Sequence, residues 1–518
     1  MVPKGGVPPP PGNNMVELVG TNTLKDCDPN PARNAVYTGV SGVNGIVADC
    51  GMTYAPDYGT LGALVVTGGG HADYGGNEVY VFPFDTMTWV RLTEPSTAIQ
   101  PLVFNTPGTN VPIGCDLVHG EHSDGTPLSN HNYSSLQAIP GGNKGLLLSY
   151  TKNNICWTGQ ESSPWSHVCD LETGVWSRYS VNAAPHRWDN IAADATCYDA
   201  SRGRVWGVNR GGSGIISYLD LASKTHSAAL GYAVNGGYLA TCARTPVNDL
   251  MLLCSAIYSE TVGAPTQLYA VDLKSPGSGI KYLALFGDVL PSVRYCPVGF
   301  DWDTANNVGW IYFGNWTWGE TDGINDTTHV YRVTPPISGS WITGTWSISK
   351  VALPSALPDC VNGPYSRWRY CSKISKFALV SKAGNKVALW TPPSGSGGDT
   401  IAPAKPIVAL NAIIAWSVPM YNVLLHGTAG PESDIAKVRI YKNGVLASEQ
   451  AVAPLATFNF TMMSAGAETL SIGHSFVDGA GNESAQLVQT VVVPAAPDLT
   501  APGAPKTPMT LVSVVWVP

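Results

Sequence analysis

A motif that recurs about every 50 residues constrains the fold of this chain more than any other feature. In "SHVCDLETGVWSRY", Asp170 is followed by Thr173 and then by Trp176. "SYLDLASKTHSAA" repeats the pattern from Asp220, and "LYAVDLKSPGSG" repeats it from Asp272. Each copy is an apolar strand that ends at an aspartate, whose carboxylate can cap a tight turn. An aromatic or polar residue then starts the next strand, so the motif marks the outer edge of a small antiparallel sheet.

Further copies extend the repeat over most of the chain. "VYVFPFDTMTWVRL" carries Pro83 in the aspartate position, with Thr86 and Trp89 at the same offsets, while "HVYRVTPPISGSW" and "NKVALWTPP" are more degenerate. Upstream of the copies lies a second strand–turn–strand pattern, as in "ATCYDASRGRVWGVN". Each repeat thus supplies about four short strands, which is one blade of a β-propeller. We predict an all-β protein with a propeller over residues 41–392.

The copies indicate six blades, and seven is the alternative. Seven stays open because the interval between Pro83 and Asp170 is longer than the other spacings. We interpret that excess as a long loop, 95–130, because it lacks strand periodicity. The last repeat has only three strands before the linker, so the ring needs a strand from elsewhere. "MVELVG" (Met15–Gly20), within an N-terminal arm at 1–40, is the candidate for this closing strand.

The repeats resemble the kelch repeats of galactose-oxidase-like propellers. The resemblance rests on "GGG" at Gly68–Gly70 and on the D-x-x-T-x-x-W turn, and it covers roughly residues 40–392. It implies blades in register around an axis, with functional groups on loops that converge over one end of that axis.

After a Gly/Ser linker at 393–400 the composition changes. "AKVRIYKNGVLA" and "DGAGNES" are typical of hairpins in a β-sandwich, and residues 401–495 resemble fibronectin type III and immunoglobulin-like modules. The tail, 496–518, repeats the start of this module, with Ala402–Pro403 matched by Ala501–Pro502. Its strand "TLVSVVWV" should pair with the module's own edge or with another subunit, because a lone strand leaves its backbone unpaired. We expect the subunit contact.

Composition narrows the function. Charged residues make up 13% of the chain and the net charge is −8, without a basic cluster, which argues against nucleic-acid binding. No apolar run is long enough to span a bilayer, so we expect no membrane insertion. The 11 cysteines form no CxxC pair and lie mostly in strand-like runs, so we expect buried free thiols and folding in a reducing cytoplasm. The N-terminus shows no secretory signal pattern.

The loops that enter the first strand of successive blades bring cations beside aromatic rings. Arg beside Trp or Tyr can stack on sugar faces and hydrogen-bond to hydroxyls or carboxylates. The alternative is that each pair packs between blades, with the guanidinium on neighbouring carbonyls. The candidate ligand-binding residues are His131, Asn132, Tyr133, His186, Arg187, Trp188, Asp189, Tyr238, Arg294, Tyr295, Arg367, Trp368 and Arg369.

The stretch "VVTGGGHADYGGNEVYVF" adds His71, Asp73 and Tyr74 as candidates that contact a ligand or shape a strand connection. Enzyme signatures are weak: no motif places a copper set of two Tyr and two His, and no complete sialidase Asp box occurs. "DWDTANN" (Asp301, Asp303) looks like a calcium loop, yet it occupies the same turn as "YDASRG" and is better explained as turn chemistry. We therefore predict no catalytic residue, no metal and no cofactor.

Together these features favour a protein assembled in the cytoplasm that acts outside it. We expect a non-enzymatic structural component of a phage virion, tail- or fibre-associated, in contact with other virion proteins and copies of itself. A host cell-surface glycan is a further expected partner. The first alternative is a secreted, extracellular bacterial carbohydrate-binding or carbohydrate-active propeller protein, and the second is an oxidase.

Overall fold

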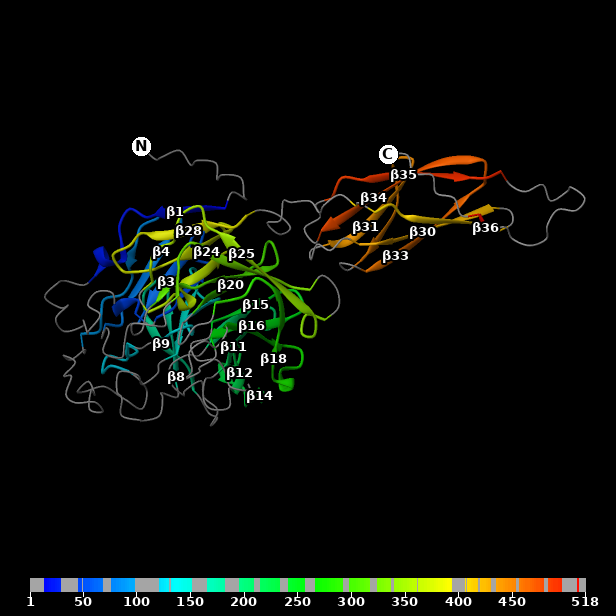
Figure 1. The fold of residues 1–518 in the computed structure, drawn as a ribbon. Helices are drawn as coiled ribbons and strands as arrows, with labels where there is room; N and C mark the ends of the chain where they lie inside the picture. Colours follow the sequence, from blue (N-terminus) through cyan, green and yellow to red (C-terminus); the bar gives the residue numbers. More distant parts are fainter. Residues whose placement is uncertain are drawn as a thin grey trace, which may run out of the picture. The chain divides into compact units, whose positions relative to one another are not determined.

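The computed structural model divides the chain into two compact units, Met1–Pro392 and Pro393–Pro518. Nearly all regular structure is β-strand (Figure 1). The described residues are 14–28, 45–48, 50–68, 76–97, 121–129, 132–150, 165–181, 195–208, 215–232, 241–256, 266–291, 298–316, 324–336, 340–360, 362–393, 406, 408–417, 420–429, 435–452, 456–478, 483–495 and 510–511.

The strands of the first unit fall into successive antiparallel groups of four, in chain order. The first group is β2 (Met52–Ala55), β3 (Ala63–Thr67), β4 (Val79–Pro83) and β5 (Val90–Arg91). The second is β6 (Gln137–Ile139), β7 (Leu146–Tyr150), β8 (Trp165–Asp170) and β9 (Trp176–Val181). The third is β10 (Ala195–Asp199), β11 (Arg204–Val208), β12 (Ile215–Asp220) and β13 (Thr225–His226), with β14 (Gly231–Tyr232) also on β12. One parallel pair, Thr225 with Val181, joins the second and third groups at their outer edges.

Later groups keep the pattern with additions. The fourth is β15 (Thr241–Thr245), β16 (Leu250–Ala256), β17 (Thr266–Asp272) and β18 (Ile280–Tyr282). The fifth is β20 (Gly299–Asp303), β21 (Val308–Tyr312), β24 (His329–Thr334) and β25 (Thr345–Ala352), with β19 (Ala284–Gly287) parallel to β25 and a hairpin of β22 (Gly314–Trp316) and β23 (Ile324–Asp326). The last is β26 (Trp368–Cys371), β27 (Lys376–Leu379), β28 (Val387–Thr391) and β1 (Met15–Val19). Short 3-10 helices lie at Leu24–Cys27, Pro276–Ser278 and Tyr365–Arg367.

The recurring aspartates cap the turns between the third and fourth strands, as the sequence predicts. Asp170 Oδ1 accepts the backbone N–H groups of Glu172 and Thr173 at 2.8 and 2.9 Å. Asp220 Oδ1 does the same for the residues two and three positions later. Two N–H groups that the turn would otherwise leave unpaired are thereby satisfied, which explains why the residue recurs. Asp303, in the suspected calcium loop, likewise accepts two turn N–H groups, so it is turn chemistry.

The first strands of the groups contact one another in a closed cycle. The strands β2, β6, β10, β15, β20 and β26 lie beside each other in that order, and β26 returns to β2. Side chains link neighbouring groups across this cycle. The links are Ala138 N to Thr53 Oγ1 (3.0 Å), Gln137 Nε2 to Thr196 O (2.9 Å), Arg244 Nε to Asp199 Oδ1 (2.9 Å), Thr241 Oγ1 to Val298 O (2.9 Å), Tyr370 N to Asp301 Oδ2 (2.9 Å) and Arg369 Nε to Met52 O (3.1 Å). An all-β fold of four-stranded sheets in a cycle is consistent with a propeller.

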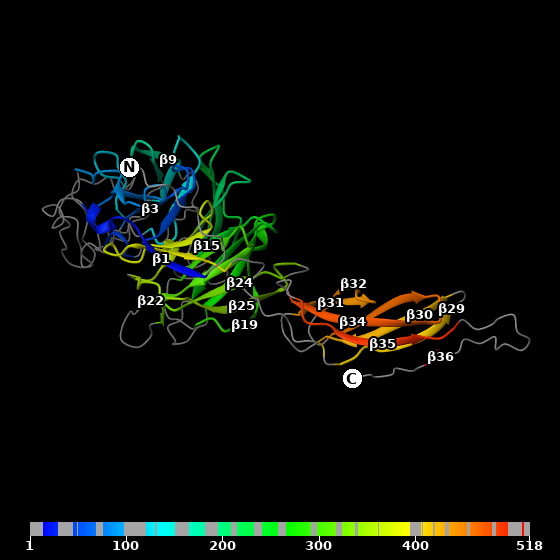
Figure 2. The same cartoon turned by 90° about the horizontal axis from the view of Figure 1, so that it is seen from above.

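The N-terminal strand β1 joins the end of the first unit. It pairs antiparallel with β28 from Met15↔Thr391 to Val19↔Val387, and Figure 2 shows it, in blue, among the yellow strands of the last group. The strand therefore fills the position that the sequence analysis leaves open in the last repeat. Under it lies an aromatic core in which Trp368 stacks on Phe377 at 4.8 Å between ring centroids.

The second unit contains two four-stranded antiparallel sheets that share one apolar core. One sheet is β33 (Thr457–Ser464), β30 (Met420–Thr428), β29 (Asn411–Ser417) and β36 (Thr510–Leu511). The other is β32 (Val445–Ala451), β31 (Ile435–Lys442), β34 (Glu468–Asp478) and β35 (Leu487–Val493). The two tail residues of β36 pair with β29 of their own chain, which is the first alternative of the sequence analysis. The subunit contact expected of the tail stays a prediction for residues outside the described ranges.

Candidate functional site

A cavity of about 510 Å³ lies along the cycle of first strands. Every first strand contributes to its wall, and so do the turns that follow β2, β6, β10, β20 and β26. Its volume is in the range of small-molecule sites, about 300–1,000 Å³. The wall combines apolar, aromatic, amide, hydroxyl, thiol and charged side chains, among them Thr53, Tyr54, Asp57, Gln137, Lys144, Cys197, Tyr198, Cys242, Arg244, Asp301, Trp302, Thr304, Arg369, Tyr370 and Ser372. Such a wall suits a small polar ligand with both apolar and hydrogen-bonding faces.

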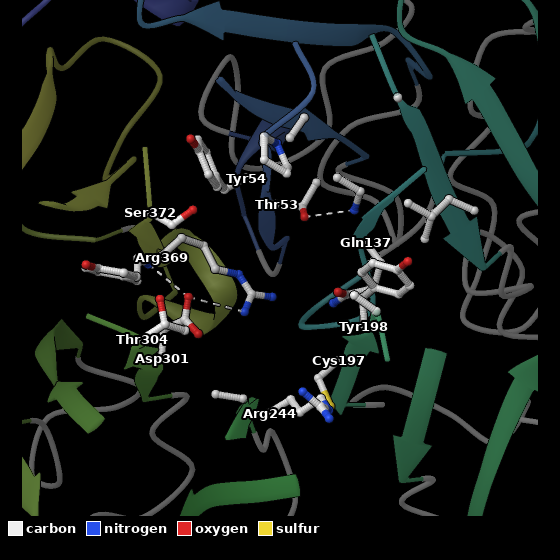
Figure 3. Close-up of a pocket in the computed structure, with 18 of the residues that line it drawn as sticks. Thr53, Tyr54, Gln137, Cys197, Tyr198, Arg244, Asp301, Thr304, Arg369 and Ser372 are labelled. Atoms are coloured by element: carbon white, nitrogen blue, oxygen red, sulfur yellow. Dashed lines mark hydrogen bonds and ion pairs between the residues drawn. The ribbon is translucent and has the colours of Figure 1, made fainter. Parts of the chain in front are cut away.

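Arg369 and Asp301 form the charged pair of the cavity (Figure 3). Arg369 Nη1 lies 3.8 Å from Asp301 Oδ2. The Asp301 carboxylate also accepts the N–H groups of Trp302 at 2.8 Å and of Tyr370 at 2.9 Å. Burial raises the pKa of Asp301, although Arg369 and the two N–H groups act in the opposite direction. In Figure 3 the Arg369 guanidinium extends from β26 into the space between Asp301 and Tyr198.

The second cavity arginine, Arg244, belongs to a network of four charges between the third and fourth groups. Its Nε lies 2.9 Å from Asp199 Oδ1 and its Nη2 lies 3.1 Å from Asp249 Oδ1. Arg202 bonds to the same two carboxylates. The hydrogen bond from Arg202 lowers the pKa of Asp249, and the charges of Arg202 and Arg244 act in the same direction. The two positive and two negative charges balance, so this network joins sheets and adds no net charge to the cavity.

Two thiols complete the wall between β10 and β15. Cys197 and Cys242 are buried and belong to the same apolar cluster. Burial raises the pKa of Cys242 well above its ordinary value, and the neighbouring Cys197 adds to the shift. A buried thiol held in its protonated form is a poor nucleophile. The eight cysteines in the described ranges are all free thiols.

The opposite ends of the first strands are tied together by the loops that enter them. Asn132 Oδ1 accepts the Gly51 N–H at 2.7 Å, and the Ser366 hydroxyl accepts the Met52 N–H at 3.2 Å. A Cβ at Gly51 would overlap Ser366 Oγ and the Tyr133 carbonyl. Glycine is therefore required where these loops meet. The loops do converge here, and their described polar groups bond largely to one another.

The predicted site residues have different surroundings. Tyr133 is buried, with its ring 5.4 Å from that of Tyr365. Arg367 is 0% exposed, and its Nη1 donates to the carbonyls of Val380 and Ser381 at 3.1 and 2.7 Å. Trp368 is buried in the aromatic core, and its Nε1 donates to Trp310 O at 3.2 Å. Candidates that lie outside the described residues are His71, Asp73, Tyr74, His131, His186, Arg187, Trp188, Asp189, Tyr238, Arg294 and Tyr295.

Of the described candidates, Arg369 alone lines the cavity. Thr53, Gln137, Tyr198 and Arg244 also line the cavity, and none of them belongs to the residues predicted from the sequence. The signal that could have identified some of them is a polar residue within a short first strand, such as Thr53 in "MTYA", Gln137 in "QAI" and Arg244 in "TCART". Every first strand contributes to the cavity wall, so positions of this kind line the cavity in each group.

The described residues contain neither a cluster of metal-ligating side chains nor a helix that could span a membrane. No cluster of three or more His, Cys, Asp or Glu side chains is placed to hold a metal ion there. None of the described helices has the length and apolar character needed to cross a bilayer.

Comparisons with known proteins do not assign the chain to a family. No protein-family model matches the sequence, and no curated protein sequence is significantly similar to it. Among solved structures, the fold is similar to exo-beta-1,3-galactanase from Phanerochaete chrysosporium, crystallised with beta-1,3-galactotriose. The match has 10% identity and a TM-score of 0.33, and it covers 92% of this chain and 100% of the other. A protein of unknown function from Bacteroides thetaiotaomicron gives 9% identity and a TM-score of 0.40, covering 73% of this chain and 75% of the other. At these scores the likenesses carry no argument about function.

Proposed function

We propose that this chain is a non-enzymatic binding protein that recognises a saccharide unit in the cavity of its first unit. The first unit is a six-bladed, kelch-like propeller in this proposal, and the second is an immunoglobulin- or fibronectin type III-like sandwich. The observation that carries the proposal is the cavity wall. It offers hydroxyl, amide and charged groups beside the rings of Tyr54, Tyr198 and Tyr370, which is the combination that binds the polar edges and apolar faces of a sugar.

A non-catalytic role is supported by the state of the groups that line the cavity. The Asp301 carboxylate is held by two backbone N–H groups and Arg369, and the Cys242 thiol is buried with a raised pKa. Arg244 is held between Asp199 and Asp249. Residues of the same chain hold these groups in place, whereas a general base or nucleophile must be free to reach a substrate.

We place this binding protein in a phage virion, at the tail or a fibre, where it contacts a host glycan and other virion proteins. The free cysteines of the described residues support folding in a reducing compartment, since secreted proteins of this kind tend to carry disulfides. The alternative is a secreted bacterial carbohydrate-binding propeller. Mass spectrometry of gradient-purified particles separates the two. Peptides of the chain in the particle fraction support the virion, and their presence only among free secreted proteins favours the alternative.

A glycan array tests the binding site directly. Ala200 is an exposed turn residue that lines the cavity, so Ala200→Trp should block it. Ala222 is an exposed turn residue of the same group outside the cavity lining, and Ala222→Trp is the matched control. We expect the first variant to lose the binding that the wild-type chain and the control share. Equal binding by all three proteins, or no binding by the wild type, would contradict the proposal.

A further inference from the structure

Arg369 is a cavity-lining arginine whose side chain is held in place by one hydrogen bond, while its outer N–H groups can still donate to a ligand. The residue is 8% exposed, and its Nε donates to Met52 O at 3.1 Å, which fixes the guanidinium across two groups of strands. Its contact with Asp301 is an ion pair at 3.8 Å, longer than a hydrogen bond. Within the described part of the chain, no hydrogen bond is formed by its Nη1 or Nη2.

Three other cations of the described residues lie near the first strands, and each is already engaged. Arg244 contacts Asp199 and Asp249. Arg367 donates to backbone carbonyls of its own sheet. Lys144 lies over the ring of Tyr58, with 4.8 Å between Nζ and the centroid. Arg369 therefore differs from them in having its outer edge directed into the cavity.

We propose that the cavity selects a saccharide unit that carries a carboxylate, and that the two Nη groups of Arg369 bind this carboxylate. The planar guanidinium presents two parallel N–H donors with the spacing of the two carboxylate oxygens. The inference rests on the proposed saccharide-binding function and adds the chemical class of the sugar. The hydroxyl groups of Thr304 and Ser372 line the same cavity and can contact the hydroxyls of the sugar.

Asp301 makes this selection depend on pH. Arg369 and Cys371 on β26, Cys242 on β15 and Asp303 on its own strand are the ionisable groups that act on it. A bound carboxylate is a second negative charge beside Asp301, so binding favours its protonated form. Burial already raises the pKa of Asp301. The affinity for an acidic sugar should therefore increase as the pH falls toward that pKa, until the sugar itself is protonated, while a neutral sugar shows no such change.

Isothermal titration of the full chain with sodium D-glucuronate and with D-glucose tests the inference, because the two sugars differ at one carbon. We expect glucuronate to bind at least about tenfold more tightly, as two charge-assisted hydrogen bonds imply. Arg369→Gln should lower the glucuronate affinity until the preference over glucose disappears, and Arg369→Lys should keep part of the preference. Arg204→Gln, a charge change outside the cavity lining, should leave both affinities unchanged.

Each outcome has a distinct meaning. If glucose binds as tightly as glucuronate, the inference fails and the saccharide function stands. If neither sugar binds and the array is also blank, the saccharide function fails. If inorganic sulfate displaces glucuronate at equal concentration, the site is a general oxyanion site and the inference is overturned. Asp301→Asn supplies an independent readout, since it should raise the glucuronate affinity and abolish its pH dependence. Unchanged pH dependence in that variant would contradict the role of Asp301.

Discussion

Replacing Arg367 distinguishes a structural arginine from a ligand-binding one. Its side chain is 0% exposed, and its guanidinium donates to the carbonyls of Val380, Ser381 and Gly363. Arg367→Met keeps most of the volume and leaves three buried carbonyl oxygens without these donors. Each unsatisfied buried acceptor costs about 1–3 kcal/mol. Removing a buried charge offsets part of the cost of the three unsatisfied acceptors. We therefore expect the free energy of unfolding to decrease by about 3 kcal/mol.

Urea unfolding of the first unit, followed by tryptophan fluorescence, measures this loss. Arg204→Met is the control, because the Arg204 ion pair with Asp220 is partly exposed and such pairs contribute about 1 kcal/mol or less. Saccharide binding by folded Arg367→Met should match the wild type. A stability change below about 1 kcal/mol together with lost binding would refute the structural interpretation and make Arg367 a ligand residue.

Two further predictions concern ring closure and the second unit. Deleting residues 1–20 removes β1, so the amides of β28 (Val387–Thr391) should lose protection in hydrogen-exchange mass spectrometry; unchanged protection would show that β1 does not close the sheet. His474 is 1% exposed, and burial lowers its pKa from 6.5 to about 4. As the pH falls, the unfolded chain therefore protonates His474 before the folded chain does. At about 1.4 kcal/mol per pH unit, the free energy of unfolding of the second unit should decrease by about 3 kcal/mol between pH 6.5 and 4. Denaturant unfolding at several pH values should show this loss in the wild type and a flatter profile in His474→Phe, and equal slopes would contradict it.

Local features were predictable from the sequence because their chemistry is local. Asp170 and Asp220 cap turns two and three residues away, so the spacing alone carries the information. The closing strand was predictable for a related reason. The last repeat lacks a strand, and Met15–Gly20 is an apolar segment without another role.

The cavity was not predictable because its wall is assembled from strands far apart in the sequence. Thr53 and Arg369 lie on adjacent first strands although most of the first unit separates them in sequence. Arg367 and Arg369 look equivalent in "YSRWRYC", yet the short helix Tyr365–Arg367 ends at the former and β26 begins at Trp368. The backbone changes direction between them, so one guanidinium bonds to its own sheet and the other enters the cavity.

A crystal structure of the full chain soaked with glucuronate tests the central claim most directly. The account predicts one sugar within the cycle of first strands, with its carboxylate in hydrogen-bond distance of both Nη atoms of Arg369. Sugar density only at another surface, or sheets that do not close through β1 and β28, would contradict it.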